Sequence, residues 1–525
     1  MDQPQFGNIN AILNLLRSNP NSYFPDISQC LNTTEQDIQR IRDEVRQLER
    51  KIVSLKAERK ELEWKASQYR SLLAPIRRLP PEVLQNIFQF ACLEGLKVGS
   101  EASSASAQIT WVCTAWRKCV RSIPGLWSVL RFERIGLTHR TIEQVGPLLR
   151  MHLELSKPSP LYVDLDIPVL PAVNNELVSF VSKVLISESP RWRTISLGVP
   201  EHYDAQLLAV KEKLPLLHTL HLKRSEFKDV MDAFEVAPSL RIVNLETNRG
   251  ISRLKLPWHQ VSSFSTKYAK CGTAYAALFK AAEATEITLS QCFNPDSLRR
   301  SLGIINHKLH SLSIVVGGQE SNFHHWFNWL TLPRLTTLNV AGAENDPPDS
   351  CTDVFLNDCF PTFLSRSSCT ITSLSFTNLP LSDVQVLAII ASLPSLSHLT
   401  VHERASQPFK NTILTSHFFD SLRMDCHHTF SSRPSPCLTK RLQSLDLCLH
   451  GTLQARSIVE FVESRWTTNP EYAAVLGVHN LTVVKILVLR SRDAMILDAE
   501  ELCDLLDVYK GLGLRVSCSS KFLDE

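Results

Sequence analysis

Residues 217–222 read Leu-His-Thr-Leu-His-Leu, and residues 240–245 read Leu-Arg-Ile-Val-Asn-Leu. Both stretches place apolar residues in the order apolar, two residues, apolar, one residue, apolar. The alternation at their ends is typical of a strand with one buried face. The pattern recurs after residue 155 at Trp192/Ile195/Leu197, Val261/Phe264/Thr266, Ala284/Ile287/Leu289, Leu309/Leu312/Ile314, Leu335/Leu338/Val340, Ile371/Leu374/Phe376, Leu396/Leu399/Val401, Leu442/Leu445/Leu447 and Val484/Leu487/Leu489.

Most steps between these copies are 21–26 residues long, and steps of 36, 46 and 42 residues imply insertions. This is the period and pattern of leucine-rich repeats, in which each repeat supplies one strand and a helical or irregular return. The usual Asn or Cys three residues past the last apolar position occurs only as Asn248 and Cys292. We therefore expect residues 156–525 to form an irregular leucine-rich-repeat solenoid, with alternate strand residues on a concave face.

The returns between the expected strands carry their own signals. Residues 382–391, 458–466 and 497–509 are expected to form outer helices, and Leu514-Arg515-Val516 is expected to close the stack. The segment 402–441 is the largest interruption and contains Cys426, His427, His428 and Cys437. Two ligand pairs with metal-site spacing are absent from it, so we expect an exposed loop there and no metal.

Before the repeats, residues 79–88 read Leu-Pro-Pro-Glu-Val-Leu-Gln-Asn-Ile-Phe. A residue before proline is pushed out of the helical region, and Pro81 suits the first position of a helix. Glu82 then falls in the first turn, where a negative charge suits the helix dipole. The apolar residues that follow have helical spacing. These features predict a helix that begins at Pro81, and packing within a small bundle would account for its apolar face.

Two further clusters follow in a fixed order: 112–117 read Val-Cys-Thr-Ala-Trp-Arg, and 123–127 read Ile-Pro-Gly-Leu-Trp. The ordered set resembles an F-box, a three-helix module that docks proteins onto the Skp adaptor of a cullin ubiquitin ligase. The resemblance implies that the adaptor contacts, carried onto matching positions, include Leu79, Pro80, Val83, Leu84, Ile87, Phe88, Val112 and Trp116. Residues 93–110 depart from the family because they are small and polar; the sequence either lacks the middle helix or places it behind a flexible insertion.

Apolar residues also repeat in heptads ahead of this module, after a capping signal at Asn32-Thr33-Thr34. One seam is Ile38, Val45, Ile52, Arg59, Ala66 and Leu73, and the other is Ile41, Leu48, Leu55, Leu62 and Tyr69. The pattern predicts a coiled-coil helix of about 40 residues that ends at Pro75.

The charges that flank the seams bear on how this helix pairs. A parallel pair would oppose Glu44 to Glu49, Lys51 to Lys56, Glu58 to Glu63 and Lys65 to Arg70, which are all repulsive. An antiparallel pair centred near residues 53–54 would oppose Glu44 to Lys65, Lys51 to Glu58, Arg42 to Glu63 and Glu49 to Lys56, which are all attractive. Our hypothesis is antiparallel pairing with a second copy; the alternative is a helix that is unpaired or packs within its own chain.

The composition sets limits on function. The chain has 525 residues, 44% hydrophobic and 21% charged, with a net charge of +3, which gives no general argument for nucleic-acid or membrane binding. It has 14 cysteines without a Cys-x-x-Cys pair, no evident signal peptide and no apolar run that would span a bilayer. We expect reduced thiols and a location in the cytoplasm, the nucleus or both.

These segments predict an α plus α/β protein with five parts: a flexible N-terminus (1–31), a coiled-coil helix (32–74), an F-box (75–132), a connector (133–155) and the repeat domain (156–525). The order is similar to that of F-box proteins of mushroom-forming fungi. The resemblance implies a non-catalytic receptor subunit that binds the Skp adaptor and a protein target of unknown identity. The alternative is an interaction scaffold without a ligase role. No phosphate-binding glycine loop, nucleophile elbow or His-Glu-x-x-His motif favours an enzyme, and we expect no cofactor.

Overall fold

The structure is a computed structural model that describes residues 14, 17–18, 25–99, 102–167, 175–198, 200, 203–223, 229–246, 250–268, 271–291, 303–316, 324–342, 359–405, 410–424, 438–466, 479–490 and 497–523. The chain divides into two compact units, Met1–Leu84 and Gln85–Glu525. A long helix dominates the first unit, and a large mixed sheet with helices makes up most of the second. The predicted combination of a helical N-terminal part and an α/β part is therefore confirmed at this level.

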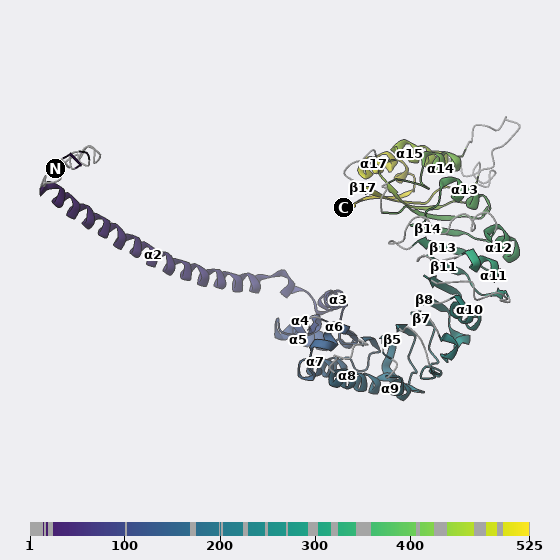
Figure 1. Cartoon of the computed structure of the whole chain (residues 1–525), viewed down its shortest axis with the longest axis horizontal. Coiled ribbons are helices and arrows are strands. Elements are labelled where there is room, and N and C mark those ends of the chain that lie inside the picture. Colours follow the sequence, from purple (N-terminus) through teal and green to yellow (C-terminus); the bar gives the residue numbers. More distant parts are fainter. Residues whose placement is uncertain are drawn as a thin grey trace. The chain divides into compact units, whose positions relative to one another are not determined.

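The long helix of the first unit is α2 (Pro25–Leu73), visible as one continuous ribbon in Figure 1. It begins before the Asn32–Thr34 signal, and the Thr33 hydroxyl donates to the Gln29 carbonyl at 3.1 Å inside the helix instead of capping its start. The predicted end is confirmed, because α2 stops at Leu73 and Pro75 opens the short 3₁₀ helix η1 (Pro75–Arg78). Both heptad seams lie on this helix.

The second unit is built on a 16-stranded open sheet. Its strands, in chain order, are β1 (Leu96–Val98), β2 (Ala102–Ser104), β3 (Val129–Phe132), β4 (Leu161–Asp166), β5 (Trp192–Gly198), β6 (Thr219–Lys223), β7 (Ile242–Glu246), β8 (Ser263–Lys267), β9 (Glu286–Ser290), β11 (Ser311–Val316), β13 (Thr337–Gly342), β14 (Ser373–Thr377), β15 (His398–His402), β16 (Ser444–His450), β17 (Val483–Arg490) and β18 (Arg515–Phe522). Two short strands, β10 (Ile304–Ile305) and β12 (Leu330–Thr331), pair separately.

From β3 to β18 the strands follow one another across the sheet in the order of the chain, and each pairs parallel with the next. At the edge of the sheet opposite β18, β1 pairs parallel with β3. Strand β2 forms that edge and pairs antiparallel with β1. Parallel neighbours need crossover connections, which helices and 3₁₀ turns supply here. The helices are α3 (Pro81–Ala91), α4 (Ala105–Ile109), α5 (Thr114–Arg121), α6 (Arg134–His139), α7 (Ile142–Leu155), α8 (Asn175–Ser187), α9 (Asp204–Leu207), α10 (Cys271–Lys280), α11 (His324–Trp329), α12 (Phe360–Ser367), α13 (Asp383–Ala391), α14 (Ser416–Leu422), α15 (Ala455–Ser464) and α17 (Ala499–Lys510).

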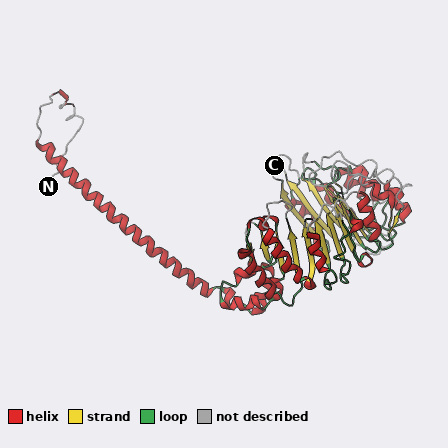
Figure 2. Ribbon diagram, turned by 60° about the horizontal axis from the view of Figure 1, so that its bottom comes forward, coloured by secondary structure: helices red, strands yellow, loops and turns green. Residues whose placement is uncertain are grey.

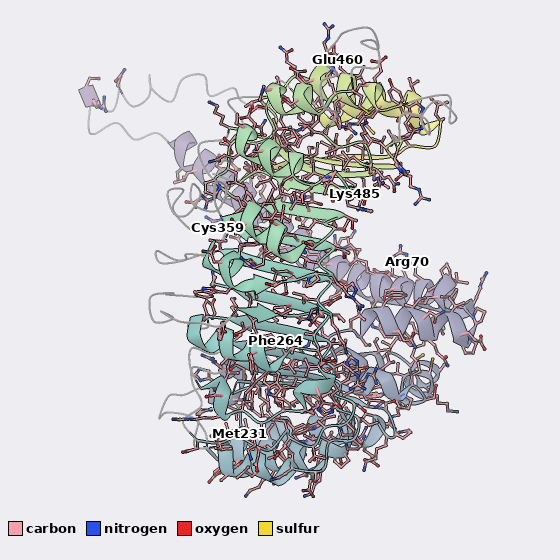
Figure 3. The ribbon with its side chains drawn as sticks, turned by 90° about the vertical axis from the view of Figure 1, so that its right-hand side faces the viewer. Arg70, Met231, Phe264, Cys359, Glu460 and Lys485 are labelled. Atoms are coloured by element: carbon pink, nitrogen blue, oxygen red, sulfur yellow. The ribbon has the colours of Figure 1, made fainter. Side chains whose placement is uncertain are left out.

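The two faces of the sheet differ in exposure. Along β6, β7, β8 and β14 fully buried residues alternate with half-buried ones, so one face is covered and the other is open to solvent. Helices α8 to α13 run along the outer side of the sheet in Figure 1, and Figure 2 shows the strands of the sheet side by side. Phe264 belongs to the covered face and Lys485 to the open face; both are labelled in Figure 3.

The repeated apolar triplets supply the covered face. Every predicted triplet from Trp192/Ile195/Leu197 to Leu442/Leu445/Leu447 is buried, and its last two members lie in register with those of the neighbouring strands. The last triplet is misplaced by three residues. Leu445 and Leu447 pair with Val484 and Ile486, so the equivalent set is Leu481, Val484 and Ile486.

Other details of the repeat region also emerge from the structure. Trp127, Leu130 and Phe132 repeat the triplet spacing inside the span predicted as the F-box, and all three are buried. The predicted outer helices correspond to α13, α15 and α17, and β18 is the last strand at its edge. In the interruption at 402–441, Cys426, His427, His428 and Cys437 lie outside the described residues. Across the described ranges, no cluster of side chains suits a metal ion, and no helix is long and apolar enough to cross a membrane.

Candidate partner-docking surfaces

Helix α3 begins where the proline pair predicts. Leu79 has extended backbone angles (φ −70°, ψ 137°), as expected for a residue before proline. The Pro80 carbonyl accepts from the N–H groups of Val83 and Leu84, both at 3.1 Å, so Pro80 closes the first turn. Glu82 lies in that turn beside the positive end of the helix dipole. The predicted start at Pro81 is confirmed.

The two sides of α3 have opposite environments. Leu84, Phe88 and Cys92, spaced at four residues, are buried. Val83, Ile87 and Phe90 have the i, i+4, i+7 spacing of a single helix face, and they are 41%, 39% and 78% exposed. We call these three residues the apolar stripe. A helix that is apolar on its solvent side as well as on its buried side is typical of a surface that another molecule covers.

Helix α5 supports the buried side of α3. The Phe88 ring meets the Trp116 indole edge to face, with ring centroids 5.0 Å apart. Cys113 caps α5, its Sγ accepting from the Trp116 N–H at 3.5 Å. Arg117 Nε donates to the Thr110 carbonyl at 2.9 Å, which ties α5 to the preceding turn. Trp116 is half-buried and belongs partly to the core of the module.

The turn between α4 and α5 carries a second exposed apolar group. The backbone N–H of Trp111 donates to the Gln108 carbonyl at 3.0 Å, and that of Val112 donates to the Ile109 carbonyl at 3.2 Å. Both bonds extend the last turn of α4. The two side chains remain largely exposed, Trp111 at 76%. Large apolar side chains held by an ordered backbone in water are candidates for contact with a partner.

A buried polar cluster anchors this helical module to the sheet. Trp127 Nε1 donates to the Val120 carbonyl at 3.0 Å, and the indole packs edge to face on the His152 ring of α7 at 4.9 Å. His152 Nδ1 lies 3.2 Å from the Trp127 carbonyl, and Nε2 lies 2.8 Å from Ser104 Oγ. Burial lowers the pKa of His152 to about 4, so the ring is neutral near pH 7.

The described residues of 93–110, where the sequence did not clearly supply the family's middle helix, form two antiparallel strands and a short helix. Leu96 and Val98 in β1 are buried and pair with Leu130 and Phe132 of β3. Ser104 then caps α4, its Oγ accepting from the Ala107 N–H at 3.1 Å. The module thus contains α3, a middle helix of five residues and α5, with two sheet strands between the first two helices.

The residues expected to contact an adaptor fall into three groups. Pro80, Val83, Ile87 and Val112 are exposed; Leu79 and Trp116 are half-buried; Leu84 and Phe88 are buried and pack inside. The expectation missed three strongly exposed apolar residues, Phe90, Leu93 and Trp111. The i, i+4, i+7 spacing from Val83 through Ile87 to Phe90 was the signal that could have identified the first of these.

The open face of the sheet is a second candidate surface. Its central row follows the strand register through Arg131, Asp164, Ser196, His221, Asn244, Ser265, Thr288, Ser313, Asn339, Ser375, Thr400, Asp446, Lys485 and Ser517. The middle of this row, from Asn244 to Thr400, consists of hydroxyl and amide side chains. Charged residues flank this neutral centre, with Arg131 and Asp164 toward one end of the row and Asp446 and Lys485 toward the other.

The charged end at β3–β6 contains an open pocket of about 610 Å³. Ion pairs hold several of the charged side chains around it: Lys223 Nζ lies 3.1 Å from Asp164 Oδ1, and Arg134 Nε lies 3.0 Å from Asp166 Oδ1. Arg131 is exposed and makes no ion pair with any described residue. Ser196 Oγ is buried in the pocket wall and has no hydrogen-bond partner in the described part of the chain. Arg131 is thus available to a ligand, whereas the Ser196 hydroxyl is enclosed in the pocket wall.

His221 lies across the same pocket. Its Nε2 is 3.4 Å from Glu246 Oε1, yet burial outweighs that carboxylate and lowers the pKa of His221 below its ordinary value. Asp166 also shapes this wall, because a Cβ added at Gly198 would meet Asp166 Oδ1 at 2.3 Å. The pocket therefore has a polar lining of both charge signs. No described cluster in it resembles a metal site or a nucleophile with its base.

No protein-family model matches the sequence, and no curated protein is significantly similar to it. The resemblance to F-box proteins therefore depends on the motif residues at 79–127.

Proposed function

We propose that the chain is a substrate receptor of a Skp–cullin–F-box ubiquitin ligase. In this role the module at 75–132 binds the Skp adaptor, and the open face of the sheet binds a protein target. The observation that carries the proposal is the apolar stripe of Val83, Ile87 and Phe90 on a helix whose opposite side is already buried. Such a surface is costly to leave in water, and an apolar adaptor groove would offset that cost.

The proposal also treats residues 156–525 as a leucine-rich-repeat solenoid. Its support is the regular addition of one parallel strand for each copy of the apolar triplet, with a helical or 3₁₀ return on the covered side. In a solenoid each repeat contacts mainly its neighbours, and the result is an extended surface for binding other proteins. The open face supplies that surface, with hydroxyl and amide groups at its centre and charged groups at its ends.

A receptor of this kind performs no bond chemistry. It holds a target near the ubiquitin-loading partner of the ligase and raises the effective concentration of target lysines. The pocket at β3–β6 supports target recognition because it offers the exposed charge of Arg131. This guanidinium can bind an acidic side chain of a target without any cofactor.

Adaptor binding tests the first half of the proposal. The full-length chain and a purified Skp adaptor are mixed at micromolar concentration, and binding is measured by calorimetry. We expect the double substitution Val83→Asp plus Ile87→Asp to abolish binding, since each would place a charge in an apolar contact. Val508→Asp on α17, where the side chain is also exposed, is the matched control and should bind normally. If the unsubstituted chain does not bind, the receptor role fails and a scaffold role remains.

Target recognition is tested separately by proximity labelling of partners in cells with and without a proteasome inhibitor. A target should accumulate among the labelled proteins when the proteasome is blocked. Arg131→Glu should remove that target while leaving adaptor binding unchanged. If the set of inhibitor-dependent partners is the same for Arg131→Glu, the pocket at β3–β6 has no part in target binding.

A further inference from the structure

Helix α2 carries two largely apolar seams, and nothing in the described part of the chain covers them. The seam residues Ile38, Leu48 and Leu62 are 44%, 53% and 56% exposed. An isolated helix in water gains little from such residues, and most helical stability in proteins comes from packing an apolar face. The helix thus has the surface of one strand of a coiled coil.

Charges beside the seams disfavour a parallel in-register pair. In that arrangement, a residue that directly precedes a first-seam residue lies next to one residue of the partner. That partner residue has a number higher by five. The pairs are Glu44 with the partner's Glu49, Lys51 with the partner's Lys56, Glu58 with the partner's Glu63 and Lys65 with the partner's Arg70. All four repel, and only Asp37 with the partner's Arg42 attracts. Like charges at these positions select against an orientation.

The antiparallel arrangement reverses the balance. When Ile52 packs against the partner's Leu55, the seams align Ile38 with the partner's Tyr69 and Val45 with the partner's Leu62. The two-fold axis makes each flanking contact twice. The contacts are Glu35 with the partner's Arg70, Arg42 with the partner's Glu63, Glu44 with the partner's Lys65, Glu49 with the partner's Lys56 and Lys51 with the partner's Glu58. Each of these contacts joins opposite charges.

The same charges also fix the register. A slip of one heptad in one direction sets Glu49 against the partner's Glu49 and leaves Asp37 with the partner's Lys65 as its only attractive flanking pair. A slip of one heptad in the other direction sets Glu49 against the partner's Glu63 and leaves no attractive flanking pair. A slip of two heptads restores attraction but shortens the overlap by two heptads of apolar seam. The centred register therefore has both the largest apolar overlap and the best charge pairing.

We propose that α2 forms an antiparallel coiled-coil homodimer, centred between Ile52 and Leu55, in which charge complementarity selects the second copy of this chain as the occupant of the exposed seam. The proposal is independent of the ligase role. Because the paired segment is about 40 residues long, the two Leu73 ends would lie roughly 60 Å apart, at opposite ends of the coil. Arg70, labelled in Figure 3, would then lie opposite the partner's Glu35.

A zero-length carbodiimide cross-link on the full-length chain tests the orientation directly. Lys65 and Glu44 are 21 residues apart, or roughly 31 Å along one helix, so they can be joined only between two chains. We expect a Lys65–Glu44 peptide in the dimer band by mass spectrometry. A chain that sediments only as a monomer at micromolar concentration, or a dimer without this peptide, would overturn the proposal.

Charge variants provide the second test and leave Lys65 and Glu44 unchanged. Glu49→Lys plus Glu63→Lys turns four antiparallel contacts repulsive, and we expect dimerisation to weaken by roughly tenfold or more. In a parallel dimer the same two changes would turn four repulsive contacts into attractive ones and tighten the pair, which would overturn the proposal. Adding Lys56→Glu and Arg42→Glu restores the antiparallel contacts. This fourfold variant should regain the dimer and the cross-link, and its failure to do so would contradict the assigned register.

Discussion

The Phe88 ring of α3 meets the Trp116 indole of α5 edge to face, with centroids 5.0 Å apart and planes at 64°. Phe88 is fully enclosed, whereas its sequence neighbour Ile87 points to the exposed side of the same helix. The residues of the motif at 79–88 thus have two roles, packing inside the module and contact with a partner. Residues on one side hold the module together, and those on the other are free to meet a partner.

Phe88→Ala should therefore unfold the helical module, and Ile87→Ser should not. Removing a buried phenylalanine costs about 3–5 kcal/mol, while a substitution at an exposed position usually costs less than about 1 kcal/mol. Hydrogen exchange of the amides in α3 and α5 measures both effects in the full-length chain. Equal protection of these amides in the two variants would contradict the assignment of Phe88 to the core.

Gly95 joins α3 to the sheet in a conformation that only glycine adopts readily. Its φ is +65°, and an added Cβ would meet the Val129 carbonyl oxygen at 2.2 Å. Gly95→Ala should destabilise the contact of β1 with β3 by about 2–4 kcal/mol, from the left-handed backbone and the backbone overlap together. Gly125→Ala is the control because a Cβ there meets nothing within 4 Å. Thermal unfolding should show a lowered midpoint for the first variant only.

The buried His152 ring makes the module sensitive to acid. Its pKa is lowered from 6.5 to about 4 in the folded chain, chiefly because burial disfavours the charged ring. The unfolded chain therefore binds this proton more tightly, so stability is kept above pH 6.5 and lost as the pH falls toward 4. The loss amounts to roughly 3 kcal/mol.

His152→Gln keeps polar atoms near Ser104 Oγ but cannot take up a proton. We expect a lower unfolding temperature than the unsubstituted chain at pH 7, together with a smaller further drop between pH 7 and pH 4.5. The difference between the two drops, measured by thermal denaturation, isolates the contribution of His152 from that of other acids and bases. The same drop in both proteins would show that another group causes the acid sensitivity.

Short sequence patterns predicted the elements whose structure depends on residues close together in the chain. The triplets identified the covered face because a strand with one buried side must alternate, and Pro81 and Pro75 marked a helix start and a helix end. The last triplet was placed three residues late because apolar residues fill 481–489 so densely that two frames fit. Strand β1 was missed because only Leu96 and Val98 mark it within a small, polar segment.

Contacts across long sequence separations had no local signal. Arg465 is fully buried, and its guanidinium donates to the Leu422 and Thr439 carbonyls and to Thr439 Oγ1, each at 2.6 Å. These bonds tie the end of α14 and the C-terminal end of the interruption at 402–441 to the end of α15. Neither the heptad nor the repeat pattern could indicate that an arginine there would be buried, because its partners come from segments 26 and 43 residues away. The open-face pocket was missed for the same reason, since four strands contribute to it.

Glu403 gives the last prediction, because its buried carboxylate organises the other end of that interruption. Oε1 accepts from the backbone N–H groups of Thr412, Ile413 and Leu414 at 3.0, 2.7 and 2.8 Å. Oε2 accepts from the Thr412 hydroxyl at 3.2 Å. Three N–H donors converge on one oxygen, and that arrangement favours a charged acceptor over a neutral one.

Glu403→Gln keeps the shape of the side chain but replaces the charged acceptor with an amide. We expect a cost of about 1–3 kcal/mol, because the amide oxygen accepts more weakly and the amide nitrogen cannot accept from Thr412 at all. The effect should be local, with faster hydrogen exchange at Thr412, Ile413 and Leu414. Glu286→Gln, at an exposed carboxylate, should change nothing. Unchanged exchange at these three amides in Glu403→Gln would mean that the loop is held by its apolar residues instead of by the carboxylate.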